Sequence, residues 1–250
     1  MNKDKRACVF CGEGNLTLEH VFPNWMSKLF DPKTTVTTKI ECVGKVEKSY
    51  VSSIFQHKAK IVCSTCNGGW MSDIETSVES TLKPMLFNLD YSTKLNESDQ
   101  KSLALWAQKT AMIMCQSTGS NYKIPDESYK KMYQSKAPVD QISVRLGWRL
   151  PKKGENGPLL SQFRISQISG PIPPEHAESL KGAEAWKAII AIGSIVFHLS
   201  GSTSNIIIEL ENNDSRVTPQ IFPYISNVIW PIEWPVDAMT SAGFEEFMYV

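Results

Sequence analysis

Apolar residues recur at helical spacing in the middle of the chain. One set shares a single helix face at intervals of three and four positions: Trp70, Ile74, Val78, Leu82 and Met85. This spacing predicts a helix over residues 70–85 with one buried face. Pro84 favours an end or a kink near there, because proline cannot donate a helix hydrogen bond.

A stronger helical pattern follows Asn96. Asn96 stands three residues before Asp99, which is typical of a helix start. The apolar face that follows is broad, comprising Leu103, Trp106, Ala107, Thr110, Ala111, Ile113 and Met114. A shorter helix is predicted from Asp126 to about Gln134.

The remaining patterns favour β structure. Near the N-terminus we expect a strand over 17–22, a short helix over 24–30, and a hairpin over 35–54 that turns at Gly44. Beyond residue 140 the expected strands cover 142–150, 159–168, 186–199, 204–210 and 224–230, with a turn at 154–157 and a short helix over 175–181.

These patterns predict an α+β fold in three parts. Residues 1–75 form a compact N-terminal module, residues 76–140 a helical segment packed on it, and residues 141–250 an antiparallel β-rich region. Nothing in the sequence indicates the role of this last region. A second copy of the chain or a partner protein is conceivable there.

Composition narrows the class of protein. Of the 250 residues, 42% are hydrophobic and 21% charged, as in globular proteins. No apolar run approaches the roughly 18 to 20 residues that span a bilayer. The first residues are charged and lack a signal-peptide pattern, so the expected location is cytoplasmic, the cysteines are expected to be reduced, and no membrane partner is expected.

Charge is balanced overall but unevenly spread. The net charge is zero, yet residues 1–70 hold 10 Lys and Arg against 6 Asp and Glu. A positive segment suits a polyanionic partner, because neutralised phosphates release counterions. A solvated surface explains so small an excess equally well.

Two C-x-x-C pairs carry the clearest chemical signal: Cys8 with Cys11, and Cys63 with Cys66. The pairs enclose a loop of 51 residues, positions 12 to 62. Two such pairs can grip a tetrahedral Zn²⁺ through four thiolates. Disulfides and redox motifs are the alternatives, and zinc fits better in a chain without an export signal. We expect Cys42 and Cys115 to be packing residues.

Three further residues have the side chains that phosphodiester hydrolysis needs. His20 can take a proton from water. Glu19 and Asn67 offer the oxygen ligands that Mg²⁺ prefers. Neighbours on a regular strand point to opposite faces, so Glu19 and His20 can share a cleft only if a bulge or strand end turns one of them.

The segments around these residues resemble a known family. Leu18-Glu19-His20-Val21-Phe22-Pro23 is similar to the acidic–His–hydrophobic–x–Pro signature of HNH endonucleases, the ββα-metal superfamily. Cys63-Ser-Thr-Cys66-Asn67 resembles the closing C-x-x-C-N of that family, and Cys8 with Cys11 its opening pair in the zinc-bearing branch. The resemblance covers residues 8–75.

The resemblance implies a role for each matched position. His20 would be the general base, and Glu19 and Asn67 would bind the catalytic divalent cation, Mg²⁺ or another. Cys8, Cys11, Cys63 and Cys66 would hold the structural zinc. Cleavage would leave a 5′-phosphate and a 3′-hydroxyl. The expected substrate is nucleic acid, and DNA is the first expectation.

Some positions depart from the family pattern. Glu19 is one methylene longer than the usual Asp. The middle asparagine has no clear match, and His57 is the nearest polar candidate to replace it. Trp70 stands near the position where the family often has lysine.

Each assignment has a simpler structural alternative. His20 could be a hydrogen-bonded strand histidine, Glu19 a surface carboxylate, and Asn67 a helix cap. Two functions therefore stay open. One is a metal-dependent endonuclease, and the other is a non-catalytic zinc module that binds nucleic acid or protein.

Overall fold

The structure is a computed structural model, and its description covers most of the chain. The backbone is described for residues 7–30, 35–42, 45–53, 58–87, 90–117, 124–150, 159–167, 184–202 and 215–236. Side chains are described within these ranges except for residues 35–50, 52–53, 159–167 and 184–185. His57, the turn at Gly44, the turn at 154–157, the helix over 175–181 and the strand over 204–210 lie outside the described residues.

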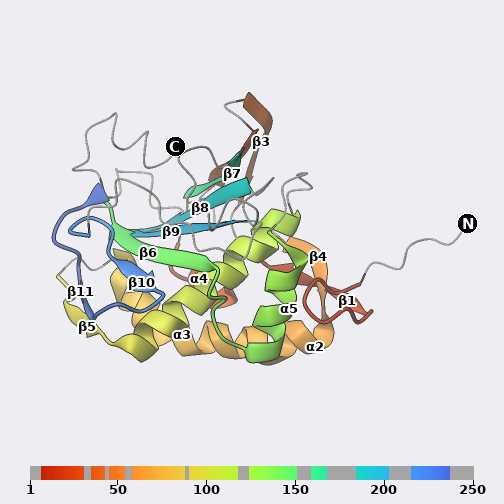
Figure 1. Ribbon diagram of the computed structural model, residues 1–250, viewed down its shortest axis with the longest axis horizontal. Coiled ribbons are helices and arrows are strands. Elements are labelled where there is room, and N and C mark those ends of the chain that lie inside the picture. The colour runs from red at the N-terminus through yellow and green to blue at the C-terminus, as the bar shows by residue number, and fades with distance from the viewer. Residues whose placement is uncertain are drawn as a thin grey trace, which may run out of the picture.

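The largest sheet has seven strands in the order β10-β6-β9-β8-β7-β2-β3 (Figure 1). Its strands are β2 (Thr35–Cys42), β3 (Lys45–Ser53), β6 (Ile142–Trp148), β7 (Leu159–Gln167), β8 (Glu184–Ile192), β9 (Ile195–Ser202) and β10 (Gln220–Phe222). All neighbours are antiparallel except β2 and β7, which pair in parallel. The N-terminal hairpin β2–β3 thus extends a sheet built by strands from after residue 140.

The prediction of one continuous strand over residues 186–199 was wrong. The segment is a hairpin of β8 and β9, paired from Ile192 with Ile195 outward. Gly193 makes the turn with φ of +53°, a conformation that favours glycine. The turn is tied to a neighbouring helix, because the Ser194 N–H donates to the Leu86 carbonyl at 2.8 Å.

Three longer helices lie together on one side of this sheet (Figure 1). They are α3 (Ser72–Phe87), α4 (Glu97–Ser117) and α5 (Asp126–Ser135). The predicted start of α4 is confirmed, since Asn96 Oδ1 accepts from the Ser98 and Asp99 backbones and Asp99 Oδ2 accepts from the Asn96 N–H. From Leu103 to Cys115, α4 is buried on nearly all sides, including its polar residues.

Two small antiparallel sheets complete the described fold. β1 (Leu16–His20) pairs with β4 (Lys58–Cys63), and β5 (Thr93–Leu95) pairs with β11 (Val228–Trp230). Of the strand predicted over 224–230, only β11 forms. One apolar core runs from the cysteine loops through the helices to the sheet. The combination of helices and mainly antiparallel sheets is an α+β fold. Among the described helices, none has the length and apolar character to cross a membrane.

Candidate functional site

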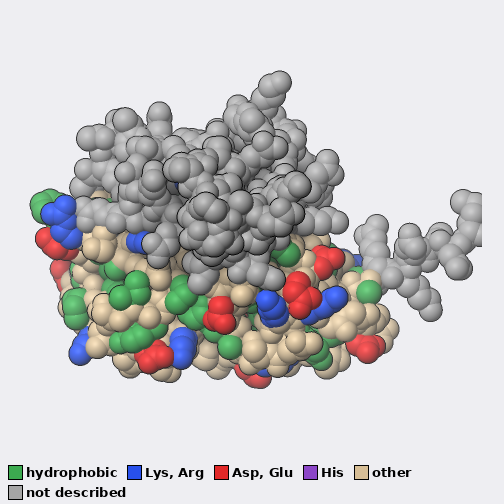
Figure 2. Space-filling model, in the orientation of Figure 1, with side chains coloured by type: hydrophobic (Ala, Val, Ile, Leu, Met, Phe, Trp, Pro, Cys, Tyr) green, Lys and Arg blue, Asp and Glu red, His purple; other side chains and the backbone are tan. Residues whose placement is uncertain are grey.

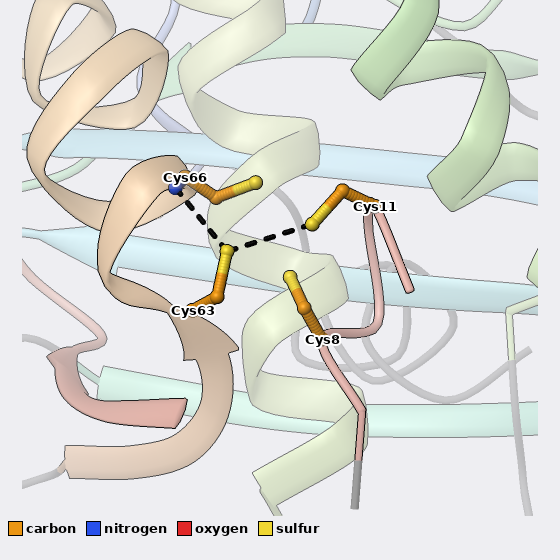
Figure 3. Close-up of side chains that lie close together, drawn as sticks. All are labelled: Cys8, Cys11, Cys63 and Cys66. Atoms are coloured by element: carbon orange, nitrogen blue, oxygen red, sulfur yellow. Dashed lines mark hydrogen bonds between the residues drawn. The ribbon is translucent and has the colours of Figure 1, made fainter. Parts of the chain in front are cut away.

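The four cysteines of the two C-x-x-C pairs come together, as the sequence predicts. Their sulfur atoms lie within 4.8 Å of one another. Cys11 Sγ and Cys63 Sγ are 3.5 Å apart, and the side chains point toward one another from two separate segments (Figure 3). This cluster, here called the thiol cage, could hold a metal ion.

Local backbone structure brings the two halves of the thiol cage into place. The first pair lies in a tight turn, in which the Gly12 N–H donates to the Cys8 carbonyl at 2.9 Å. The turn is fastened to β4, because the Val9 N–H donates to the Ile61 carbonyl at 3.1 Å. The second pair lies where β4 ends and the short helix α2 (Ser64–Cys66) begins. The thiol cage therefore joins the start of the chain to the β4–α2 junction.

The thiols of the cage differ in acidity. Burial raises the pKa of both the Cys11 and the Cys66 thiol. Burial also acts on Cys63, but hydrogen bonds from the Cys66 backbone and the neighbouring thiols outweigh it and lower the Cys63 pKa. The Cys66 backbone N–H donates to Cys63 Sγ at 3.4 Å. Cys63 is thus the most readily ionised of these three thiols.

An aromatic side chain, Trp70, and a cationic one, Lys136, lie beside the thiol cage. Trp70 packs edge-on against Phe10, with ring centroids 5.2 Å apart. Lys136, just past the end of α5, places its ammonium 4.8 Å from the Trp70 ring centroid. An interaction with the Trp70 side chain lowers the pKa of the Cys66 thiol, against the larger effect of burial. Trp70 is therefore a packing residue of the thiol cage.

Glu19 and His20 end the strand that pairs with β4. The β1–β4 register shifts between Thr17 and Glu19, so the strand is irregular just before the two residues. Glu19 and His20 themselves pair with the consecutive residues Ala59 and Lys58, so the irregularity precedes both side chains and His20 is the last residue of the strand. Glu19 is 4% exposed, whereas His20 is half-buried. The alternative of a surface carboxylate at Glu19 does not hold.

A buried lysine lies between Glu19 and a second carboxylate. Lys109, from the middle of α4, is fully buried, and its ammonium lies 2.6 Å from Glu75 Oε1. The same nitrogen is 3.9 Å from Glu19 Oε1, beyond hydrogen-bond range. Glu75 belongs to the first turn of α3, and its carbonyl accepts the Trp25 indole N–H at 3.3 Å. Residues from β1, α3 and α4 thus share one charge cluster, in which Glu19 and Lys109 are buried and Glu75 is partly exposed.

Burial and neighbouring charges act in opposing directions on the pKa of Glu19 and on that of His20. Burial raises the pKa of the Glu19 carboxyl to about 7; Lys109 acts to lower it and Glu75 to raise it further. Burial also lowers the pKa of His20, and Lys58 adds to that effect, while Glu75 acts in the opposite direction. The His20 imidazole is therefore neutral at neutral pH and able to accept a proton.

Asn67 is held against the strand that carries Glu19 and His20. Its side-chain Nδ2 donates to the Thr17 hydroxyl at 3.0 Å. Thr17 in turn donates to the Val62 carbonyl on β4 at 3.3 Å. Asn67 begins a π-helical turn, η2 (Asn67–Met71), and its side chain does not cap a helix. Asn67 is therefore not a helix cap, which was the structural alternative for this residue.

Sequence reasoning missed Lys109 and Glu75. A signal for Lys109 is present, because it is the only charged residue between Ser102 and Ser117, in a stretch otherwise typical of a buried helix. A lone charge in such a helix calls for a buried partner. Nothing in the sequence points to Glu75, which resembles any acidic residue in a first helical turn.

Comparison with known proteins adds no relative. No model of a known protein family matches this chain, and neither a similar curated protein nor a similar solved structure was found. The assignment of roles therefore depends on the residues and their geometry alone.

The visible surface does not single out a nucleic-acid face. In Figure 2 basic and acidic side chains are interspersed over the described part of the face shown. Within the described part of the chain, no second group of three or more His, Cys, Asp or Glu side chains is gathered for a metal as the thiol cage is. A divalent ion beside Glu19 would have to take oxygen ligands from water and substrate as well as from the protein.

Proposed function

We propose that this protein is a divalent-metal-dependent endonuclease of the HNH type that hydrolyses the phosphodiester bonds of DNA, with the thiol cage as a structural zinc site. The observation that carries the proposal is the hydrogen bond from Asn67 to Thr17. It ties the amide to the strand that ends in Glu19 and His20.

The order of elements supports the proposal. The antiparallel pair β1–β4 is followed directly by α2, η2 and α3. Two strands and a helix in this sequence order are what the term ββα-metal describes. The hairpin β2–β3 is inserted between the two strands and belongs to the large sheet instead.

The donor set fits a hard divalent cation. Among the described residues Glu19 accepts no side-chain hydrogen bond, and its one cationic neighbour lies 3.9 Å away. A carboxylate oxygen that accepts no hydrogen bond from the protein is available to a cation or to water. Because the Asn67 NH₂ group donates to the Thr17 hydroxyl, the side-chain carbonyl oxygen of Asn67 remains available as an acceptor.

The thiol cage fits zinc in ligand type and spacing. Four thiolates at Zn–S distances of about 2.3 Å form a tetrahedron whose sulfurs are about 3.8 Å apart. The observed separation of 3.5 Å between Cys11 and Cys63, and the 4.8 Å limit for the whole set, bracket that value. Such a site would stabilise the fold by joining residues 8–11 to the β4–α2 junction.

In the proposed reaction the residues of the chain divide the work. His20 takes a proton from the attacking water, which requires its neutral form. Glu19 and Asn67 would hold the divalent cation, which would supply charge neutralisation at the phosphate. Thr17 fixes the Asn67 side chain so that its oxygen keeps one orientation.

The ion pair of Glu19 favours a second candidate function. If Lys109 satisfies the Glu19 charge permanently, the thiol cage is a non-catalytic zinc module that binds nucleic acid or protein. In that case Glu19 and His20 need no metal, and the protein binds without cleaving.

A cleavage assay separates the two candidates. Purified protein is incubated with supercoiled DNA, linear DNA and RNA under Mg²⁺, Mn²⁺, Ca²⁺ and EDTA, beside the His20→Ala variant. Cleavage that needs a divalent cation and disappears in the variant supports the nuclease. Equal activity of the variant, or none in the wild type under any cation, contradicts it.

A further inference from the structure

The cluster of Glu19, Lys109 and Glu75 contains more than the proposed function uses. Lys109 is fully buried, so its ammonium cannot reach a substrate in solvent. Any contribution it makes to the site must pass through the carboxylates beside it.

The two ion pairs of Lys109 are unequal. Its ammonium lies 2.6 Å from Glu75, a short charge-assisted hydrogen bond, but 3.9 Å from Glu19, a distance that leaves only Coulomb attraction. Lys109 therefore donates its hydrogen bond to Glu75 and not to Glu19. Glu19 keeps both carboxylate oxygens free of hydrogen bonds from the described residues.

We propose that Lys109 is a positioning residue that neutralises Glu75 and so reserves the charge of Glu19 for the divalent cation. This inference rests on the proposed function, because it concerns the same cation site. It assigns Glu75 the task of holding the ammonium away from Glu19.

The arrangement matters because it sets the net charge beside Glu19. With both acids ionised, the cluster of two carboxylates and one ammonium carries one net negative charge. Removing the Glu75 charge leaves Glu19 as the one acidic partner of the ammonium among the described residues, so the lysine competes with the divalent cation. Removing Glu75 and Lys109 charges together restores one net negative charge on Glu19 alone.

The test measures Mn²⁺ affinity by calorimetry or electron paramagnetic resonance on zinc-loaded protein. The variants are Glu75→Gln, the double variant Glu75→Gln/Lys109→Met, and Glu19→Gln, which removes the cation ligand. Glu79→Gln is the matched control, because Glu79 lies one helical turn further along α3 in an exposed pair with Lys83. Zinc content and thermal melting report on folding separately.

We expect Glu75→Gln to weaken Mn²⁺ binding on the order of tenfold or more. The double variant should recover most of that affinity, and Glu79→Gln should bind like the wild type. The double variant also guards against misfolding of the single one, since it leaves no unpaired buried ammonium.

Two results overturn the inference while leaving the nuclease intact. One is a folded Glu75→Gln protein that binds Mn²⁺ as tightly as the wild type. The other is a folded double variant that stays without Mn²⁺ binding. If the wild type binds Mn²⁺ through Glu19 but cleaves nothing, the nuclease fails and the inference stands. If the wild type binds no Mn²⁺, both fail.

Discussion

Asn67 donates its side-chain amide to the Thr17 hydroxyl at 3.0 Å, across 50 positions of sequence. The bond joins the residue that follows the second C-x-x-C pair to the strand that ends in Glu19 and His20. Asn67 directly follows Cys66, so this hydrogen bond lies next to the thiol cage.

Removing the Thr17 hydroxyl should loosen Asn67. Thr17→Val keeps the shape of the side chain but deletes the acceptor, and we expect the Mg²⁺ concentration for half-maximal cleavage to rise about tenfold. Thr17→Ser, which keeps a hydroxyl, should remain close to the wild type. Equal Mg²⁺ requirements for all three proteins would show that the hydrogen bond does not orient a cation ligand.

His20→Ala should remove cleavage while leaving the fold intact. Loss of a general base lowers hydrolysis by about 100-fold or more, and the side chain is only half-buried. The rate is measured under Mg²⁺, with zinc content and circular dichroism as checks on folding. Leu18→Ala truncates an exposed side chain on the same strand and serves as the control. A His20→Ala protein as active as that control would refute the role of His20.

Cys63→Ser should abolish the metal site and the folded N-terminal module together. We expect one tightly bound zinc per chain in the wild type, and its loss in the variant, because a structural metal contributes folding free energy. Elemental analysis and thermal melting measure both. Cys115→Ala is the matched control, since Cys115 is buried but is not part of the thiol cage. Freshly purified wild-type protein without zinc would remove the basis for the metal site.

Gly193→Ala should destabilise the β8–β9 hairpin. An added Cβ would lie 2.3 Å from the Leu86 carbonyl oxygen, and the φ of +53° is strained for alanine. We expect a loss of about 2 kcal/mol or more in the free energy of unfolding, measured by urea titration. At Gly14, where a Cβ meets nothing within 4 Å, alanine should cost far less. Equal losses at both positions would mean that the close approach to Leu86 is relieved easily.

Acidification should remove the stability that the neutral His198 contributes. Burial, with Lys187 and Arg145, lowers the pKa of His198 from 6.5 to about 3. The unfolded chain therefore binds a proton that the folded one does not bind, so the contribution of His198 to the free energy of unfolding falls as the pH drops below about 6.5. Between pH 8 and pH 5 this amounts to about 2 kcal/mol.

The comparison with a His198→Gln variant isolates this effect. The raised pKa of Glu19 acts in the opposite sense, favouring the folded state as the pH falls below 7, and it is present in both proteins. The free energy of unfolding of the wild type minus that of the variant should thus fall by about 2 kcal/mol on going from pH 8 to pH 5. A difference that stays constant over this range would contradict the assignment to His198.

Features that depend on neighbours in sequence could be predicted without the structure. The start of α4 follows from Asn96 and Asp99, because both partners of that cap lie within one turn. The thiol cage follows from the spacing of its two pairs, since each C-x-x-C already presents two sulfurs to one point. The hairpin of β8 and β9 was missed, because a continuous apolar run is compatible with one long strand as well as two buried ones.

The amino-acid sequence supplies the chemical groups of the site: four thiols, an acidic residue beside a histidine, and an amide directly after the last thiol. The position of Lys109 between Glu19 and Glu75 comes instead from tertiary packing. A buried ammonium needs counter-charges, and these lie wherever the packing of distant segments places them. Here packing brings α4 against α3 and β4, and β4 pairs with the strand that carries Glu19, so no sequence spacing encodes the meeting of the three residues.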